Sequence, residues 1–339
     1  MKKTAVVILN WNGQKLLEKF LPALLKNTPD ETADIIVADN GSTDTSLPYL
    51  EQSYPSIRLI RFDKNYGFAE GYNKALAQLN YEYVVLLNSD VEVTESWLTT
   101  AINYIENHPE VAALQPKILS YNDKSSFEYA GACGGFLDLY GYPFCRGRIF
   151  NTVEKDLGQY NQEIEVLWAS GACLLIRLKD YLEAGGLDAY FFAHQEEIDL
   201  CWRLKARGKK IVCLPQSTVY HVGGATLGME HPRKTFLNFR NNLLIVYKNL
   251  PDKQYRNVMF YRFFTDRLAA FQFLLKGHPV NAFSILKARY NFNKQKKNYK
   301  TIRKENLEKA IIDLPAGIFR ISLLWKYYIK GKHVYSSLR

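Results

Sequence analysis

Short runs of apolar, often β-branched residues recur along the first part of the chain, and polar or glycine residues follow most of them. The runs cover Thr4–Leu9, Asp34–Ala38, Ile57–Phe62 and Tyr83–Leu87. Continuous apolar runs of this length are typical of strands buried on both faces of a parallel sheet. Helical spacing of apolar residues follows the first run, in a segment where Pro22 is expected to kink or split the helix. The alternation predicts an α/β fold with a mostly parallel sheet flanked by helices.

The pattern is weaker in the middle of the chain. Residues 120–165 are rich in Gly and Tyr, and we expect a loop or a small excursion from the sheet there. A helix is predicted from about Glu197 to Arg207, where Gly208 ends it, and a strand is predicted over Lys210–Leu214. These elements complete a first domain that we place at residues 1–249.

Charge changes sharply near residue 250. Residues 1–249 hold 25 Lys and Arg against 29 Asp and Glu, whereas residues 250–339 hold 19 against 5. The second region is also aromatic, and Ile318–Ile329 places its apolar residues on one side of a helical wheel. We therefore predict a basic, amphipathic helical C-terminal region that contacts either an anionic membrane surface or another protein chain, as in a homo-oligomer.

Composition excludes several classes of protein. The chain has 339 residues, is 47% hydrophobic and carries five scattered Cys without a CxxC spacing. Wholesale disorder, a disulfide scaffold and a zinc ribbon are therefore disfavoured. An apolar run of about 18 residues, which a spanning helix needs, does not occur. We expect a cytoplasmic protein, and its basic region resembles none of the common nucleic-acid-binding modules.

Polar clusters stand at the ends of two predicted strands, where ligands collect in parallel α/β sheets. Asp39, Asn40 and Asp44 could accept hydrogen bonds from a nucleobase and a ribose, or could form an ordinary turn with a helix cap. Asn88 and Asp90 follow the next such strand, where a carboxylate suits a hard divalent cation. A turn-capping role is the alternative for Asp90.

Three further clusters could carry chemistry. Glu196, Glu197 and Asp199 open the predicted helix beside an aromatic run, and such crowding raises a carboxyl pKa as a general base requires. Capping of the helix is the simpler explanation. His221, followed by two glycines, could be a ligand or a packed side chain. Arg240 belongs to a cationic stretch that could bind phosphate or could lie on a solvated helix face.

In this order the clusters resemble the inverting family 2 glycosyltransferases of the GT-A fold, and especially the rhamnosyltransferase-like branch that builds bacterial cell-surface polysaccharides. The matching segments span about three quarters of the chain. They are VVILNWNG (6–13), VADNGSTD (37–44), NYGFAEGYNKAL (65–76), LLNSDVEV (86–93), WASGACLLIR (168–177), FFAHQEEIDLCWRLKARG (191–208) and YHVGG (220–224).

The resemblance implies a role for each matching residue. Asp90 and His221 would hold Mg²⁺ or Mn²⁺ on the donor diphosphate, and Glu197 would be the general base, with Glu196 as the alternative. Asp199 and Trp168 would contact the acceptor or support the site. The nucleotide sugar would be bound by Asn10, Asp39, Asn40, Asp44, Asn65, Gly67, Phe68, Asn73, Asn88, Asp90 and Arg240.

Two positions depart from the family pattern. Asn88 stands where the family keeps the first acid of its metal motif, and Glu197 stands where an Asp is usual. These departures leave open a degenerate protein that binds a nucleotide sugar without transferring it. A sugar nucleotidyltransferase is disfavoured, because NWNGQK (10–15) is a poor match to the glycine-rich, basic loop of that class.

The resemblance also implies the substrates and the location. The donor would be a nucleotide sugar, with dTDP-rhamnose expected first and a UDP-sugar as the other choice. The acceptor would be a saccharide, free or linked to a polyprenyl lipid. The enzyme would then act as a peripheral protein at the inner face of the plasma membrane.

Overall fold

The computed structural model describes residues 2–223 and 231–338. Within these residues, nine strands form one mixed sheet in which the order is β11-β13-β6-β12-β4-β1-β2-β3, with β5 paired to β13. β1, β2, β3 and β4 are mutually parallel where they pair, whereas β12 runs antiparallel to both of its neighbours. The strands are β1 (Thr4–Asn10), β2 (Asp34–Asp39), β3 (Arg58–Arg61), β4 (Tyr83–Leu87), β5 (Val91–Val93), β6 (Val111–Ser120), β11 (Ile164–Glu165), β12 (Cys173–Arg177) and β13 (Lys210–His221).

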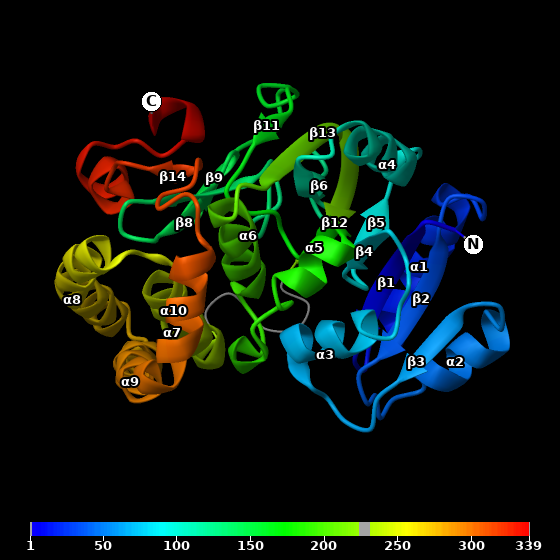
Figure 1. Ribbon diagram of the computed structural model, residues 1–339, viewed down its shortest axis with the longest axis horizontal. Helices are drawn as coiled ribbons and strands as arrows, with labels where there is room; N and C mark the ends of the chain where they lie inside the picture. Colours follow the sequence, from blue (N-terminus) through cyan, green and yellow to red (C-terminus); the bar gives the residue numbers. More distant parts are fainter. Residues whose placement is uncertain (1, 224–230, 339) are drawn as a thin grey trace.

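Helices cover both faces of this sheet (Figure 1). Side chains alternate along each strand, so that Val6 and Ile8 face one hydrophobic cluster while Ala5 and Val7 face the other. Apolar residues of α1, α2 and α4 pack in the first cluster, and those of α3, α5, α6 and α7 pack in the second. The helices are α1 (Gln14–Asn27), α2 (Ser46–Ser53), α3 (Gly67–Leu76), α4 (Trp97–Asn107), α5 (Leu178–Glu183), α6 (Glu196–Ala206) and α7 (Pro232–Asn249). The predicted α/β class is confirmed.

Helix α1 is one continuous helix that contains Pro22, so the predicted split does not occur. Pro22 and Glu18 are both on the exposed side of α1. The carbonyl that loses its hydrogen bond to the proline can therefore bind water instead.

Residues 120–165, expected to form a loop or a small excursion from the sheet, supply four strands of a second, smaller sheet. Its order among the described residues is β10-β9-β8-β7-β14. The strand β14 comes from the C-terminal region and pairs in parallel with β7. The strands are β7 (Gly135–Asp138), β8 (Pro143–Cys145), β9 (Arg148–Ile149), β10 (Thr152–Val153) and β14 (Ile318–Phe319).

The helix predicted over residues 318–329 is contradicted in its first half. Ile318 and Phe319 form β14, and the Phe319 ring packs edge-on against Phe136 and Phe144 in the small sheet. Residues 323–329 are helical and end in the π turn η3 (Trp325–Ile329). At residues 318 and 319, helical spacing is outweighed by the packing of β-branched and aromatic side chains against an available sheet edge.

The rest of the C-terminal region is helical, as expected. The helices α8 (Asp252–Leu275) and α9 (Pro279–Gln295) pack beside α7, and η2 (Lys296–Tyr299) leads into α10 (Lys300–Lys309) (Figure 1). The turn η4 (Tyr335–Leu338) ends the described chain. Across residues 2–223 and 231–338, no helix has both the length and the apolar content needed to cross a bilayer.

Candidate functional site

A groove of about 2160 Å³ runs along the edge of the main sheet where β1, β2 and β4 end. Because these strands are parallel, their carboxyl ends meet at one edge, as the sequence predicts. The small sheet, the start of α6, and α7 and α8 supply the other walls. The predicted site residues that line the groove are Asn40, Asn65, Gly67, Phe68, Asn88, Asp90, Trp168, Glu196, Glu197 and His221.

The loops after β1 and β2 are bonded to each other. Asn10 donates a hydrogen bond of 3.1 Å to one carboxylate oxygen of Asp39, and the other oxygen accepts the backbone N–H of Ser42 at 2.9 Å. Asp44 accepts the backbone N–H groups of Gln14 and Ser46. Asn10 and Asp39 are buried, and none of these three predicted residues lines the groove. These three residues instead hold the loops after β1 and β2, and other residues of those loops line the groove.

Asn40 joins this loop to the start of α3. Its side-chain oxygen accepts the N–H of Tyr66 at 3.0 Å, and its amide donates to the carbonyl of Gly67 at 3.0 Å. Asn65 accepts the N–H of Gly67 at 2.7 Å. Gly67 has a φ of +80°, and a Cβ there would lie 2.6 Å from the ring of Phe192. Glycine is therefore required at this point, where the chain approaches the segment before α6.

Asp90 and His221 lie next to each other in the wall of the groove. Nε2 of His221 is 3.1 Å from Oδ1 of Asp90 and 3.4 Å from the side-chain amide of Asn88. The other ring nitrogen, Nδ1, is buried and makes no hydrogen bond to the part of the chain that the structure describes. The nearest carboxylate oxygen that faces it is Oε1 of Glu128, at 3.5 Å. Burial lowers the pKa of His221, but Asp90 and Glu128 outweigh it and raise the pKa to about 10.

Glu128 is a groove residue that the sequence analysis missed. It lies in the irregular segment between β6 and β7, where no pattern of spacing marks it. Gly223 has a φ of +68°, and a Cβ there would lie 2.7 Å from Oε1 of Glu128. The glycine after His221 therefore makes room for this carboxylate. Gly224, the second of the two, lies outside the described residues.

The first turn of α6 presents Glu196 and Glu197 to the groove. Burial raises the pKa of Glu197 to about 7. Burial, and then the charge of Glu197, raise the pKa of Glu196 well above its usual range. Oε2 of Glu196 is buried without a hydrogen-bond partner. Near neutral pH Glu196 therefore keeps its proton, and Glu197 is the member of the pair that ionises first.

The backbone before α6 is strained. Phe192, His194 and Gln195 have φ values of +64°, +70° and +70°, which side chains other than glycine seldom adopt. Asn241 of α7 holds this segment, because its amide donates to the carbonyls of Phe191, Ala193 and His194. Such strain persists only where surrounding contacts over-determine it, and it is typical of functional sites.

Arg240 is directed toward the same segment rather than the groove. Its guanidinium donates to the carbonyls of Tyr190 and Phe191 at 3.0 and 3.1 Å, and the residue is buried. The cations of α7 that line the groove are its neighbours Arg233 and Lys234. The structure therefore does not bring Arg240 to the place where a diphosphate was expected.

Asp199 and Asn73, two more predicted site residues, lie outside the groove and hold the segments next to it. Asp199 is fully buried and pairs with Arg203 at 2.9 Å and with Lys248 at 2.8 Å. Burial alone would raise the pKa of Asp199, but these two cations outweigh it and lower the pKa to about 2. Asn73 donates to the carbonyl of Leu187 at 2.7 Å and accepts its N–H at 2.9 Å. Neither residue lines the groove.

Trp168 lies where the two sheets meet. Its indole N–H donates to the carbonyl of Phe136 at 3.0 Å, and a Cβ on Gly135 would lie 2.0 Å from its ring. The indole is buried yet contributes to the groove wall. Trp168 could therefore contact an acceptor in the groove or support the groove wall, the two roles expected for it.

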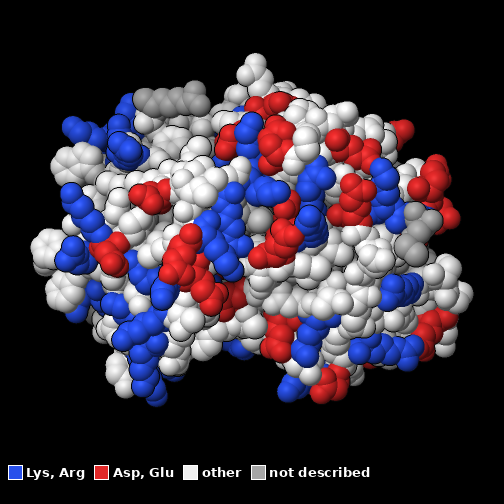
Figure 2. Space-filling view, in the orientation of Figure 1, with Lys and Arg blue, Asp and Glu red and all other residues white. Residues whose placement is uncertain are grey.

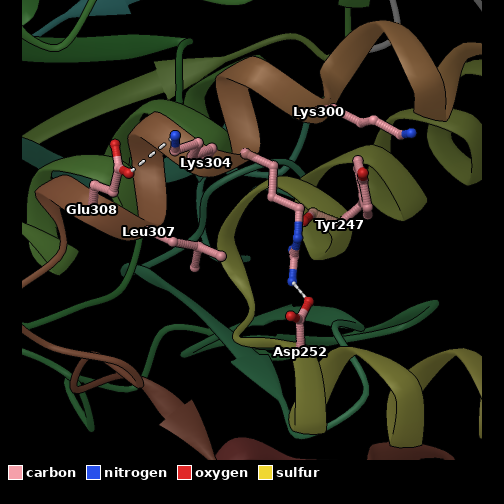
Figure 3. A pocket seen from close by; sticks show the side chains of 7 residues that line it. Tyr247, Asp252, Lys300, Lys304, Leu307 and Glu308 are labelled. Carbon is pink, nitrogen blue, oxygen red and sulfur yellow. Dashed lines mark hydrogen bonds and ion pairs between the residues drawn. The ribbon is translucent and has the colours of Figure 1, made fainter.

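A second, smaller hollow of about 460 Å³ lies between α7, α8 and α10 (Figure 3). Arg303 pairs there with Asp252 at 2.7 Å, and Lys304 pairs with Glu308 at 3.8 Å. None of the predicted site residues lines this hollow. The groove is therefore where the candidate chemistry is concentrated.

Comparison with known proteins agrees with this geometry. Residues 5–179 match the profile of Glycosyl transferase family 2. An N-acetylglucosaminyl-diphospho-decaprenol L-rhamnosyltransferase of Mycobacterium tuberculosis is 29% identical over 243 residues, which cover 66% of this chain and 78% of the relative. The rhamnosyltransferase WbbL of Escherichia coli K12 is 26% identical over 258 residues, which cover 74% of this chain and 93% of the relative.

Solved structures of glycosyltransferases share the fold. Staphylococcus aureus TarS 1–349 in complex with UDP superposes with a TM-score of 0.54 at 16% identity, covering 94% of this chain and 95% of the other. GalNAc-T7 with UDP, GalNAc and Mn²⁺ gives 0.58 at 16% identity, covering 89% of this chain and 57% of the other. The family match and the shared fold lead to one conclusion: this chain belongs to glycosyl transferase family 2 and is a glycosyltransferase of the GT-A fold.

Proposed function

We propose that this enzyme transfers a sugar, with inversion, from a nucleotide sugar to a saccharide acceptor during polysaccharide synthesis. The donor we propose first is dTDP-rhamnose, since two relatives are named rhamnosyltransferases, and a UDP-sugar is second. The acceptor we propose is linked to a polyprenyl diphosphate, because one relative's name describes such an acceptor. The enzyme would then act at the inner face of the plasma membrane.

One observation carries the proposal. The acids of α6 and the pair formed by Asp90 and His221 line the same groove, at the edge of the main sheet where β1, β2 and β4 end. A proton acceptor and a site for a charged leaving group are both needed for a single displacement at a sugar carbon. The groove provides a candidate proton acceptor and a candidate site for the leaving group. The proposed displacement needs no covalent intermediate with the enzyme.

Glu197 is the stronger candidate for the base. A general base works best when its pKa lies near the working pH, and the pKa of Glu197 is about 7. Glu196 keeps its proton to higher pH, because burial and its neighbour both oppose its charge. Ionised Glu197 would take the proton from the acceptor hydroxyl as that oxygen attacks the anomeric carbon.

The side chains present fit a divalent cation that is shared with a diphosphate. Asp90 offers a carboxylate and His221 an imidazole, and their facing atoms are 3.1 Å apart. Within the described residues, no group of three His, Cys, Asp or Glu gathers as a cation site, so phosphate oxygens would complete the shell. Glu128 faces the far ring nitrogen of His221, where a carboxylate typically orients a metal-binding histidine. A cation held there would stabilise the charge of the departing nucleoside diphosphate.

Release of nucleoside diphosphate from a panel of nucleotide sugars tests the proposal. The panel is run with Mn²⁺, with Mg²⁺ and with a chelator, for the wild type, Asp90→Asn and the matched control Asp63→Asn, whose carboxylate is on the exposed surface. We expect one donor to be turned over in the presence of a divalent cation, with the activity lost in Asp90→Asn and kept in Asp63→Asn.

Two outcomes would contradict it. Equal turnover with chelator and with cation would remove the metal from the proposal. Cation-dependent binding of the nucleotide sugar without turnover, even with lipid-linked saccharides supplied, would indicate the degenerate binding protein instead.

A further inference from the structure

The helix α8 has an outer face that is apolar and exposed. Phe260, Phe264 and Leu268 follow one another at helical spacing and are 72%, 57% and 65% exposed. Its buried side combines the apolar residues Tyr255, Val258 and Ala270 with Arg262 and Asp266, which pair with each other at 2.8 Å. The helix therefore carries large apolar side chains on the side away from the protein core as well, unlike an ordinary surface helix, whose outer face is polar.

The next helix also has an apolar outer face. Phe283 and Tyr290 of α9 are 65% and 70% exposed, although the buried side of α9 already packs Ile285 and Phe292. We call the outer faces of α8 and α9, together with the π turn η3, the apolar shelf. Its members are Phe260, Phe263, Phe264, Leu268, Phe271, Leu274, Leu275, Val280, Phe283, Leu286, Tyr290, Trp325, Tyr328 and Ile329, all exposed. A soluble monomer seldom exposes so many large apolar side chains on neighbouring elements.

Basic side chains surround the shelf. Residues 253–304 contain thirteen Lys and Arg but a single acid, Asp266, which is buried. Arg267 and Lys287 are exposed beside the aromatic rings, and the guanidinium of Arg267 lies 3.6 Å from the ring centre of Phe263. In Figure 2, Lys and Arg lie among uncharged side chains over the edge where Figure 1 shows α8. Apolar side chains within a basic rim match a membrane surface that contains anionic lipid.

The shelf is continuous with the groove. Phe271 and Leu275 of α8, with Trp325 and Tyr328 of η3, are exposed and also line the groove. A molecule that enters the groove past these residues passes from an apolar, basic surface to Glu197 and Asp90. The path suits a substrate whose charged head is attached to a long hydrocarbon chain.

We propose that the apolar shelf inserts into the head-group region of an anionic membrane and so opens the groove directly onto the bilayer. Binding of the shelf to a membrane does not depend on the proposed function. Only the entry of a lipid-linked acceptor into the groove rests on the proposed function. A second copy of the chain is a poorer occupant, because two shelves placed face to face would bring the basic rims together.

Vesicle binding by the full chain tests the proposal. Vesicles of equal parts phosphatidylcholine and phosphatidylglycerol are compared with vesicles of phosphatidylcholine alone. One variant carries Phe260→Ser, Phe264→Ser, Phe283→Ser and Tyr290→Ser, which are exposed positions away from the groove. A matched control carries Leu157→Ser and Leu182→Ser, which are also exposed but distant from the shelf in the sequence.

We expect the wild type and the control to sediment with the anionic vesicles and the shelf variant to bind at least roughly tenfold more weakly. Replacing Arg267 and Lys287 with Glu should weaken binding to anionic vesicles by a similar factor. Equal binding by the shelf variant, or no binding by the wild type, would overturn the proposal. A dimer of the wild type that dissociates in the shelf variant, without vesicle binding, would overturn it in favour of a second copy.

The release of nucleoside diphosphate in solution separates this proposal from the proposed function. The shelf variant should retain that release, because its four changes do not touch the groove. Absence of release in every form, with normal vesicle binding, would refute the transferase activity while leaving the membrane surface intact.

Discussion

Replacement of Glu197 with glutamine should abolish transfer and at the same time stabilise the folded protein at alkaline pH. The carboxyl group lies at the start of α6, where burial raises its pKa from 4.5 to about 7. Glutamine keeps the shape of the side chain but carries no charge. The folded state of the variant therefore no longer holds an ionised carboxylate in a buried position.

The size of the effect follows from the shift. Each pKa unit corresponds to about 1.4 kcal/mol, so a shift from 4.5 to about 7 opposes folding by at most about 3.5 kcal/mol once the group is ionised in both states. Water that reaches this half-buried carboxyl screens its charge and makes the penalty smaller. Below the unfolded-state pKa both states are protonated, and the penalty is absent. Between the two values the folded state binds more protons than the unfolded state, so the free energy of unfolding falls as the pH rises.

Urea unfolding at about pH 4 and about pH 8 measures the difference between variant and wild type. We expect near-equal free energies of unfolding at the lower pH and a variant that is more stable by about 1–3 kcal/mol at the higher pH. Glu183→Gln is the control, since that side chain is 63% exposed and should show no such pH dependence. Turnover of Glu197→Gln should fall by about 10²–10⁴-fold.

Either half of the experiment can refute the reasoning. A variant no more stable than the wild type at alkaline pH would mean that the Glu197 carboxylate is well solvated, and the argument for its tuned pKa would fail. Unchanged turnover would remove Glu197 as the base and leave Glu196 to be tested in the same way.

Four further predictions concern the surroundings of the groove. Asp199→Asn removes the carboxylate that pairs with buried Arg203 and one of the two that pair with Lys248, and it should lower the free energy of unfolding by about 3–5 kcal/mol in urea; a loss under 1 kcal/mol would contradict the buried ion pairs. Asn73→Ala removes the bonds that hold the turn before α6 and should cost about 1–3 kcal/mol, and an unchanged melting temperature would speak against them. Gly135→Ala places a Cβ 2.0 Å from Trp168 and should cost about 1–3 kcal/mol, with a shift of indole fluorescence; an unshifted spectrum would contradict the close packing. Glu128→Gln should weaken Mn²⁺ binding in the presence of nucleoside diphosphate by about 10–100-fold in calorimetry, whereas equal affinity would exclude a positioning role.

The sequence predicts the main sheet well because its central strands are continuous apolar runs. The predicted Thr4–Leu9 and Asp34–Ala38 each extend by one residue in the structure, to Asn10 and Asp39. Parallel strands share one carboxyl edge, so Asn40, Asn88 and Asp90 could be placed together before any coordinates were known.

The small sheet could not be predicted in the same way. Its strands are two to four residues long, which is too short for a two-residue period to stand out. One of the two partners of β7, the strand β14, also lies about 180 residues later in the chain. Glu128 was missed for a related reason, since its position facing His221 depends on the fold of that irregular segment and not on local spacing.

Residue type alone also misplaced Arg240. An arginine beside polar residues on a helix is as suitable for phosphate as for backbone carbonyls, and the periodicity of α7 does not separate the two. The structure directs it to Tyr190 and Phe191, which it helps to hold in the strained approach to α6. Long-range contacts of this kind are set by tertiary packing.

The pairing of β14 with β7 has a consequence for synthesis of the chain. Gly135–Asp138 leaves the ribosome long before Ile318–Phe319, so the small sheet can close only after residue 319 has emerged. Trp325 and Tyr328, which line the groove, follow a few residues after that strand. Strands β1, β2 and β4 can therefore pair early, whereas this part of the groove wall forms only after residue 328 has been made. A nascent chain would lack that wall until then.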